Sequence, residues 1–497
     1  MNQQHGDLRR LAGQLVMIRF PGTELDVATA RFLRDNGIRA VCLFRGNMVD
    51  AAQLSKLTAD LRSVLGPGAL IAIDQEGGAV VRSTWVPAPP AAMGLGAADD
   101  TDLARRTGAA VARAVKALGF NWNFAPVLDL NNNPDNPVIA ERSFGAVPER
   151  AAELAMAWME GSHAEGIACC VKHFPGHGDT SVDSHRDLPT VDKPRSELEA
   201  FEFAPFRIAA PVAPAVMTAH IVYPAIDADN PATMSPAILD GILRREWQYE
   251  GVIITDGMDM HAIAGRYGVG NAAVRALAAG ADMVMALGTP ATQDETLDAI
   301  AHAIAGGTIS RAQVDQRLAR LAALAGSYPV APRAYAEDAA DRAVMAEGWR
   351  RALTSRGNPQ RPAPSSKVRL VVRQDVVSDG VSEAGVPAAA VAASLGRLYD
   401  VELVTFADAE SFDWAALPQD GRYTILASTS RLRYGPHARA TWRPSLHLAL
   451  WNPYQALDID APALMTYGFA APALDSVNAW LSGALEAAGK CPVPGFA

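Results

Sequence analysis

The chain of 497 residues is too long for one ordinary hydrophobic core, so its length predicts two domains. Its net charge of −10, with no basic block, argues against nucleic acid as the main partner. No run of eighteen apolar residues occurs, so we expect no membrane span. The first twenty residues lack the apolar centre of a signal peptide, and we expect a cytoplasmic protein.

The first two-thirds of the chain alternates short apolar runs with amphipathic stretches. Strands are expected at residues 14–20, 38–44, 69–74, 120–125, 167–173, 213–219, 251–256 and 281–287. Helices are expected at residues 24–36, 49–65, 101–117, 147–165, 195–209, 235–247, 268–279 and 290–305. Eight strand–helix units predict a parallel sheet, and eight is the number that closes a (β/α)8 TIM-like barrel. An open doubly wound sheet is the alternative, but polar residues at the strand ends favour one circular mouth.

A second, smaller alternation follows the first. Helices between residues 313 and 345 are expected to brace the barrel, and residues 356–366 have the composition of a linker. Further strands are expected at residues 368–372, 401–406, 423–427, 446–451 and 464–467, with helices at 386–398 and 472–488. The sequence therefore predicts a catalytic barrel over residues 1–350, a linker over 351–366 and a smaller α/β domain over 367–497.

Titratable side chains stand where the predicted strands end. Asp74 ends the third strand, Lys172 and His173 end the fifth, and Asp256 ends the seventh. In a barrel these ends converge on one face, where the chemistry of such folds takes place. A helix cap or a salt-bridge partner is the alternative role for Asp256.

Two arginines follow the third and fourth predicted strands. Arg82 lies eight positions after Asp74, and Arg142 lies in a long loop. Both could donate hydrogen bonds to a polyhydroxylated ligand, with Asp74 as an acceptor, or could be solvated surface charges.

The segment VKHFPGHGDTSVDSHRDLP, residues 171–189, is a long loop rich in Gly and titratable groups, which favours a lid. Asp183 and His185 are two positions apart, so an extended backbone places both side chains on one side. A carboxylate orients an imidazole and favours its protonated form, as general acid–base catalysis requires. A polar turn, with Asp183 bound to backbone amides, is the alternative. A metal site including His173 and His177 is disfavoured, since the spacing is not that of a helical zinc site, and we expect no metal and no cofactor.

Taken in order, these motifs resemble glycoside hydrolase family 3, in particular its bacterial β-N-acetylglucosaminidases of the two-domain kind. The matching pieces are DQEGG (74–78), NFAPVLD (123–129), ERSFG (141–145), KHFPGHG (172–178), DSH (183–185), MTAHIVYP (217–224) and ITD (254–256). The resemblance runs from about residue 11 to 306 and resumes at 466–474 and 489–493. KHFPGHG followed by DSH separates the N-acetylglucosaminidase branch from the β-glucosidases.

The resemblance implies a fold and a set of roles. The fold would be a (β/α)8 barrel followed by an α/β sandwich. The catalytic residues would be Asp256 as nucleophile, His185 as acid/base and Asp183 as the dyad partner of His185. The N-acetylglucosamine unit would be held by Asp74, Arg82, Arg142, Lys172 and His173. Ala79 and Gly257 depart from residues common in the family, but neither touches the implied catalytic pair.

The resemblance therefore predicts a retaining exo-β-N-acetylglucosaminidase that acts on a carbohydrate substrate through a covalent glycosyl–Asp intermediate. A cytoplasmic bacterial member would recycle cell-wall fragments. The alternatives are another family 3 activity, such as a β-glucosidase or a phosphorylase, and a non-catalytic sugar-binding barrel. The sequence predicts neither the aglycone nor the oligomeric state.

Overall fold

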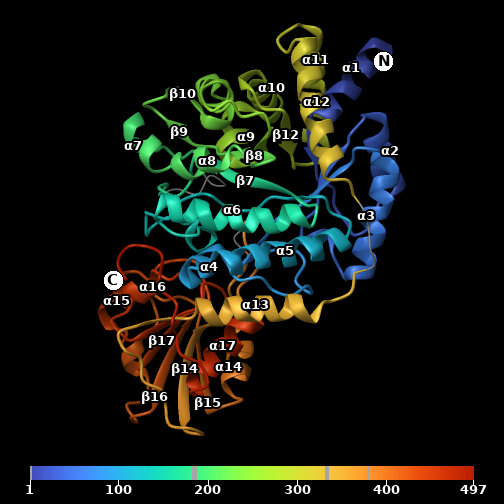
Figure 1. The fold of residues 1–497 in the computed structure, drawn as a ribbon. Helices are drawn as coiled ribbons and strands as arrows, with labels where there is room; N and C mark the ends of the chain where they lie inside the picture. Colours follow the sequence, from blue (N-terminus) through green and yellow to red (C-terminus); the bar gives the residue numbers. More distant parts are fainter. Residues whose placement is uncertain (1–2, 182–186, 331–334, 379, 497) are drawn as a thin grey trace. The chain divides into compact units, whose positions relative to one another are not determined.

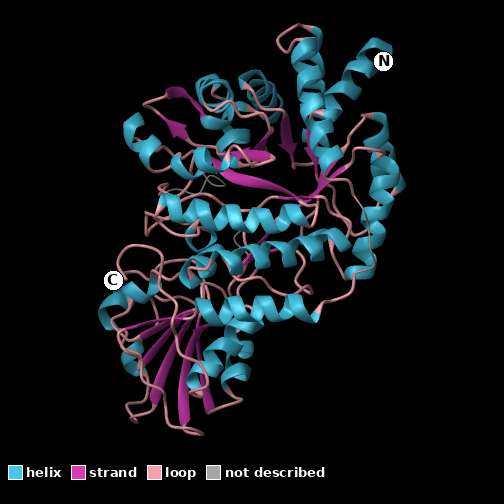
Figure 2. Ribbon diagram, in the orientation of Figure 1, coloured by secondary structure: helices cyan, strands magenta, loops and turns pink. Residues whose placement is uncertain are grey.

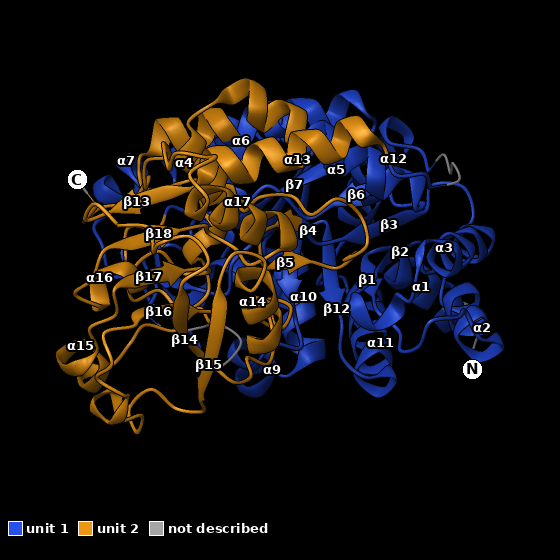
Figure 3. Ribbon diagram, turned by 90° about the horizontal axis from the view of Figure 1, so that it is seen from below, with its two compact units in different colours: residues 1–75, 108–130, 155–337 blue, residues 76–107, 131–154, 338–497 orange. Residues whose placement is uncertain are grey.

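The computed structural model describes residues 3–181, 187–330, 335–378 and 380–496 (Figure 1, Figure 2). These residues form two compact units, coloured separately in Figure 3. The first comprises Met1–Gln75, Gly108–Leu130 and Ala155–Glu337, and the second comprises Glu76–Thr107, Asn131–Leu154 and Asp338–Ala497. Each unit draws on separate stretches of the chain, and the domain division at residues 351–366 stays a prediction.

The first unit contains a closed barrel of eight parallel strands in the order β1-β12-β11-β8-β7-β6-β3-β2. The strands are β1 (Val16–Ile18), β2 (Ala40–Cys42), β3 (Leu70–Ile73), β6 (Trp122–Asn123), β7 (Ala168–Phe174), β8 (Ala215–Thr218), β11 (Val252–Gly257) and β12 (Met283–Ala286). Each strand falls on one of the eight ranges expected from the sequence. The predicted (β/α)8 barrel is therefore confirmed, and the open doubly wound sheet is excluded.

The barrel strands are buried on both faces. All seven residues of β7 and all four of β3 are buried. A parallel strand covered on both faces is apolar at every position rather than at alternate ones. This burial explains why the strands appear in the sequence as continuous apolar runs.

The helices that follow the barrel strands include α2 (Val27–Asp35), α3 (Ala51–Leu65), α5 (Thr101–Ala117), α6 (Pro148–Ala164), α10 (Val269–Ala279) and α11 (Pro290–Ala305). Other elements of the first unit are α1 (Gln3–Gln14), η1 (Arg45–Asn47), α9 (His261–Tyr267), α12 (Arg311–Ser327), η3 (Ala232–Met234) and a hairpin of β9 (Val222–Tyr223) and β10 (Asp227–Pro231). The boundary between the two units falls inside α5 and α6. None of the helices within the described ranges is long and apolar enough to cross a membrane.

Two predicted helices differ from expectation. The stretch at 195–209 is two short helices, α7 (Arg195–Ala200) and α8 (Ala204–Ala209). Phe201 leaves the helical region, and α8 begins with a proline in its first turn, where the missing N–H costs no intrahelical bond. The stretch at 235–247 is a π-helix, η4 (Ala237–Glu246).

The second unit contains a six-stranded sheet in the order β13-β18-β17-β16-β14-β15. Its strands are β13 (Thr354–Arg356), β14 (Lys367–Arg373), β15 (Asp400–Phe406), β16 (Tyr423–Ser428), β17 (Leu446–Ala449) and β18 (Ala463–Met465). All neighbours are parallel except β13, which pairs antiparallel with β18. The five strands expected here are present, and β13 adds a sixth inside the range expected to be a linker.

Helices and short turns cover this sheet. They are α13 (Ala339–Ala352), α14 (Ala388–Leu395), η5 (Trp414–Ala416), α15 (Pro436–Thr441), α16 (Gln455–Asp458) and α17 (Ala471–Leu481). From earlier in the chain, the unit also contains α4 (Ala92–Ala98), η2 (Ala140–Arg142), β5 (Val80–Val81) and most of β4 (Gln75–Gly77). Successive residues of β14 face opposite sides: Leu370 packs in the cluster around Trp480, and Val371 in the cluster around Trp442. With apolar layers on both faces of its sheet, the second unit confirms the expected α/β sandwich.

Candidate active site

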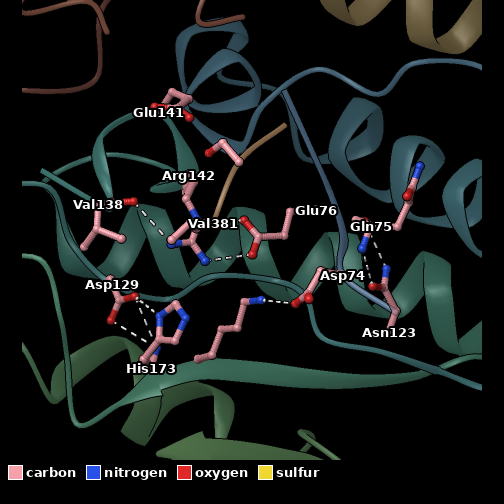
Figure 4. Close-up of polar contacts among 12 residues, drawn as sticks. Asp74, Gln75, Glu76, Asn123, Asp129, Val138, Glu141, Arg142, His173 and Val381 are labelled. Atoms are coloured by element: carbon pink, nitrogen blue, oxygen red, sulfur yellow. Dashed lines mark hydrogen bonds and ion pairs between the residues drawn. The ribbon is translucent and has the colours of Figure 1, made fainter. Parts of the chain in front are cut away.

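A buried ion pair joins two of the predicted sugar-binding residues. Asp74 follows β3 directly, and Lys172 lies in β7. Lys172 Nζ donates to Asp74 Oδ1 at 2.8 Å (Figure 4). Only 3% of the lysine side chain and 13% of the aspartate side chain are exposed to solvent. The pair is therefore almost entirely buried, and Asp74 is the more exposed of its two side chains.

His173, the next residue in β7, is held by a carboxylate from another loop. His173 Nδ1 lies 2.6 Å from Asp129 Oδ2 (Figure 4). The backbone N–H of His177 donates to Asp129 Oδ1 at 2.6 Å. A carboxylate only accepts, so Nδ1 carries the proton, and in the neutral ring Nε2 is the acceptor. Burial alone would raise the pKa of Asp129, but the neighbouring His173 and His177 bring that pKa below its usual range.

Asp256 stands at the carboxyl end of β11. One of its oxygens, Oδ1, accepts the backbone N–H of Gly257 at 2.7 Å, so the expectation that Gly257 does not touch the catalytic pair is wrong. The carbonyl of Gly257 in turn accepts from His220 Nε2 at 2.9 Å. His220 is buried, and its other ring nitrogen lies 2.8 Å from Thr233 Oγ1. The strand end that carries Asp256 is thus fixed by a buried histidine.

Asp74 directly follows β3, Lys172 lies in β7, and Asp256 lies near the end of β11. All three strands are parallel members of one closed barrel. The carboxyl ends of such strands open on one face of the barrel. Three side chains that the sequence placed at the ends of separate strands therefore lie at the same face of the barrel.

The two predicted arginines lie in the second unit, where each has a carboxylate partner. Arg142 Nε and Nη2 donate to the two carboxylate oxygens of Glu76 at 2.9 and 2.8 Å (Figure 4). Arg82 Nη1 donates to Glu383 Oε1 at 3.0 Å and to the carbonyl of Val381 at 2.9 Å. Both arginines are nearly buried, so the alternative that they are solvated surface charges is wrong. Two-point pairing of the Arg142 kind fixes the guanidinium plane.

Two of the proposed catalytic residues, Asp183 and His185, lie outside the described residues. The chain on either side of them is anchored within the first unit. Lys193 Nζ lies 2.6 Å from Asp179 Oδ2, and Tyr223 donates its hydroxyl to the carbonyl of Gly176. Within the described ranges, no group of His, Cys, Asp and Glu side chains is arranged to hold a metal ion.

The sequence predicts no separate role for Asp129, Glu76 or Glu383. Asp129 and Glu76 stand inside recognised motifs, and Asp129 directly follows an apolar run, which was the available signal. No sequence signal points to Glu383, because it lies 301 positions from its partner Arg82.

The protein-family model for the N-terminal domain of glycosyl hydrolase family 3 matches residues 7–324, which is more than half of the chain. The chain belongs to glycosyl hydrolase family 3. The resemblance seen in the sequence is thereby confirmed. Membership of family 3 leaves the role of each side chain as a prediction.

Several relatives within family 3 are similar to the chain. The β-N-acetylglucosaminidase structure from Paenibacillus sp. str. FPU-7 is 32% identical, with a TM-score of 0.89, over 98% of each chain. Beta-hexosaminidase A of Pseudoalteromonas piscicida is 33% identical over 69% of this chain, and the match spans only 60% of that protein's length. The structure of NagZ from Neisseria gonorrhoeae in complex with N-trifluoroacetyl-D-glucosamine is 33% identical, with a TM-score of 0.53, over 63% of this chain and 98% of that one.

Proposed function

We propose that the protein is a retaining exo-β-N-acetylglucosaminidase with Asp256 as its nucleophile. The observation that carries the proposal is that Asp256 lies at the end of a barrel strand on the same face as the buried pair of Lys172 and Asp74. Membership of family 3 and the similarity to a β-N-acetylglucosaminidase over nearly the whole chain support the substrate class.

The proposed reaction has two steps. A carboxylate oxygen of Asp256 attacks the anomeric carbon while the bond to the leaving oxygen breaks, and His185, oriented by Asp183, gives its proton to that oxygen. Neutral His185 then takes a proton from water, whose oxygen displaces Asp256 from the sugar. Two displacements at one carbon give net retention. An imidazole with an ordinary pKa near 6.5 suits both proton transfers at neutral pH.

The remaining residues would hold the N-acetylglucosamine unit. Asp74 would accept from a sugar hydroxyl, with its charge kept in place by Lys172. His173 would present Nε2, because Asp129 holds its Nδ1–H. Arg82 and Arg142 would donate to sugar oxygens from guanidinium groups that Glu383 and Glu76 hold in place.

The activity is tested with 4-nitrophenyl β-N-acetylglucosaminide and the corresponding β-glucoside, using wild type and Asp256→Ala side by side. We expect turnover of the first substrate, and a loss in the variant of more than about 10³-fold. Asp259→Ala, which removes a carboxylate three positions later, is the matched control and should keep most of the activity. Added azide should partly restore Asp256→Ala and yield a glycosyl azide of inverted configuration.

Other results would point to other functions. Preference for the glucoside would assign a β-glucosidase, and phosphate-dependent release of a sugar 1-phosphate would assign a phosphorylase. Folded wild type that binds sugar without turnover of either substrate would favour a sugar-binding barrel.

We also propose that the chain divides into two domains at residues 351–366.

A further proposal is that this activity serves the cytoplasmic recycling of cell-wall fragments. The recycling role predicts a higher kcat/KM on soluble peptidoglycan fragments with a terminal β-linked GlcNAc than on chitin disaccharide. Equal values would contradict it.

A further inference from the structure

A cavity of about 740 Å³ opens at the carboxyl ends of three barrel strands that carry none of the proposed site residues. Its walls come from the chain after β1, after β2 and after β12, and from helix α2. All of these belong to the first unit. A volume of this size is typical of a pocket for a small organic ligand.

The lining of this cavity is mainly apolar and aromatic. Phe20 is buried, Phe32 and Phe44 are half-buried, and Ala28 lies exposed in the lining on α2. The guanidinium carbon of Arg19 lies 5.8 Å from the centre of the Phe44 ring. The cavity therefore offers ring faces and methyl groups to a ligand.

The two amide side chains of the lining are already engaged with the protein. Asn47 Nδ2 donates to the carbonyls of Phe20 and Gly22 at 2.9 and 2.7 Å. Gln293 Nε2 donates to the carbonyls of Arg19 and Gly288 at 2.8 and 3.2 Å. These two amides tie the chain after β1 to the chain after β2 and after β12. The cavity is thus formed in advance, with the amide N–H groups of both side chains already used.

The strand order places this cavity next to the proposed active site. Around the barrel, β2, β1 and β12 fill the interval between β3, which leads to Asp74, and β11, which carries Asp256. A Cβ built on Gly288, a lining residue, would lie 3.4 Å from Cβ of Asp259, three positions after Asp256. A group attached to a sugar bound near Asp74 and Asp256 can therefore reach the cavity along the mouth.

We propose that this cavity is the subsite for an apolar aglycone, an alkyl, acyl or aryl group joined to the sugar that is released. The proposal rests on the proposed glycosidase activity and extends it to substrate class. An apolar group loses no hydrogen bonds on entry and gains from leaving water.

The test compares methyl and octyl β-N-acetylglucosaminide as substrates of wild type, Ala28→Trp and Arg31→Trp. For wild type we expect kcat/KM at least tenfold higher on the octyl glycoside. Ala28→Trp fills the cavity from an exposed position of α2, so it should bring kcat/KM on the octyl glycoside down to the value on the methyl glycoside. Arg31→Trp places the same side chain at an exposed position of α2 outside the lining and should keep the preference.

Equal kcat/KM for the two glycosides in wild type, or an octyl preference that survives Ala28→Trp, would overturn the proposal while leaving the glycosidase activity standing. If wild type turns over neither glycoside, calorimetric titration with both gives the answer: octyl binding must be tighter in wild type and Arg31→Trp but not in Ala28→Trp. A dimer in wild type that Ala28→Trp disrupts, without any chain-length effect, would assign this face to self-association instead.

Discussion

The carboxylate of Asp129 is the most heavily used acceptor of the barrel mouth. It accepts the backbone N–H groups of His173 and His177 and the ring Nδ1–H of His173. An asparagine at this position has only one accepting oxygen, and its NH₂ group would face one of the N–H donors of His173 or His177. We therefore expect Asp129→Asn to tilt the His173 ring and to lower kcat/KM by roughly 10²-fold, the scale of a 1 Å misplacement.

The comparison for Asp129→Asn is Asp192→Asn, which makes the same exchange at an exposed position. Steady-state kinetics on 4-nitrophenyl β-N-acetylglucosaminide measures the difference, with the melting temperature as a check on folding. Full activity in Asp129→Asn would show that His173 needs no carboxylate.

The pair of Lys172 and Asp74 makes a prediction about stability as well as binding. Because the pair is almost buried, Lys172→Met leaves a carboxylate without its cation in a poorly hydrated place. Removing one member of such a pair costs about 3–5 kcal/mol. We expect Lys172→Met to lose about that much stability in urea unfolding, and Lys172→Met/Asp74→Asn to regain more than half of it. Strictly additive losses would mean that the two side chains are not coupled.

At the scale of elements, the loop after β7 depends on close backbone approach. A Cβ on Gly178 would lie 1.5 Å from the carbonyl oxygen of Leu130, an approach that only glycine permits. Gly178→Ala must push the loop away from the chain around Asp129. Since this loop leads to Asp183 and His185, we expect activity to fall more than tenfold.

Gly326→Ala is the matched change, because nothing lies within 4 Å of a Cβ at that helical position. It should keep full activity and be at least as stable as wild type, since alanine favours the helix. Gly178→Ala with wild-type kinetics would show that the loop tolerates displacement.

The elements also show what the sequence could predict. The eight barrel strands were evident because burial on both faces leaves an uninterrupted apolar run, and Asp74, Lys172, His173 and Asp256 were evident because they end such runs. The partners Glu383 and Asp129 depend on contacts between distant segments, which no local pattern records. Strand β13 was missed because its three residues, Thr354–Arg356, are ordered by pairing with β18 and not by their own hydrophobicity.

At the scale of the molecule, the second unit is assembled from segments far apart in the chain. Glu141 Oε1 accepts from Arg431 Nη2 at 3.0 Å and from Trp451 Nε1 at 2.8 Å, across 290 and 310 positions of sequence. All three side chains are buried. A second contact set packs Met93 of α4 in one apolar cluster with Met465 and Tyr467. The loop that carries Arg142 is therefore supported by the C-terminal sheet.

This assembly predicts the outcome of truncation. A chain that ends at residue 350 leaves Glu141 without Arg431 and exposes the apolar side of α4. We expect that fragment to be inactive and to bind a hydrophobic dye. The comparison is the full chain with a protease site inserted at the exposed residues 363–365, which should stay active after cleavage because its contacts remain. An active, soluble fragment would favour an independent barrel domain over residues 1–350.

The stability of the second unit should fall in mild acid because of one histidine. His447 of β17 is fully buried, with Nε2 2.7 Å from Ser428 Oγ. Its Nδ1 has no hydrogen-bond partner among the described residues. Burial lowers the pKa of His447 from 6.5 to about 3. A proton on this ring would therefore be a buried charge with an unpaired N–H.

The sign of the pH effect follows from which state binds the proton. Between pH 6.5 and 3 the unfolded chain protonates His447 and the folded chain does not, so stability is fully present above pH 6.5 and declines as the pH falls. At 1.36 kcal/mol per pKa unit, the contribution of this one group between pH 7 and pH 5 is about 2 kcal/mol. His447→Gln keeps a donor near the position of Nε2 but does not titrate. Between pH 7 and pH 5 the free energy of unfolding of the second unit should therefore fall by about 2 kcal/mol less in this variant than in wild type. Calorimetric melting at pH 7 and pH 5 measures the difference, with a change at an exposed position, His302→Gln, as the comparison. Equal losses of stability in wild type and His447→Gln would mean that His447 binds its proton in the folded state as readily as in the unfolded state.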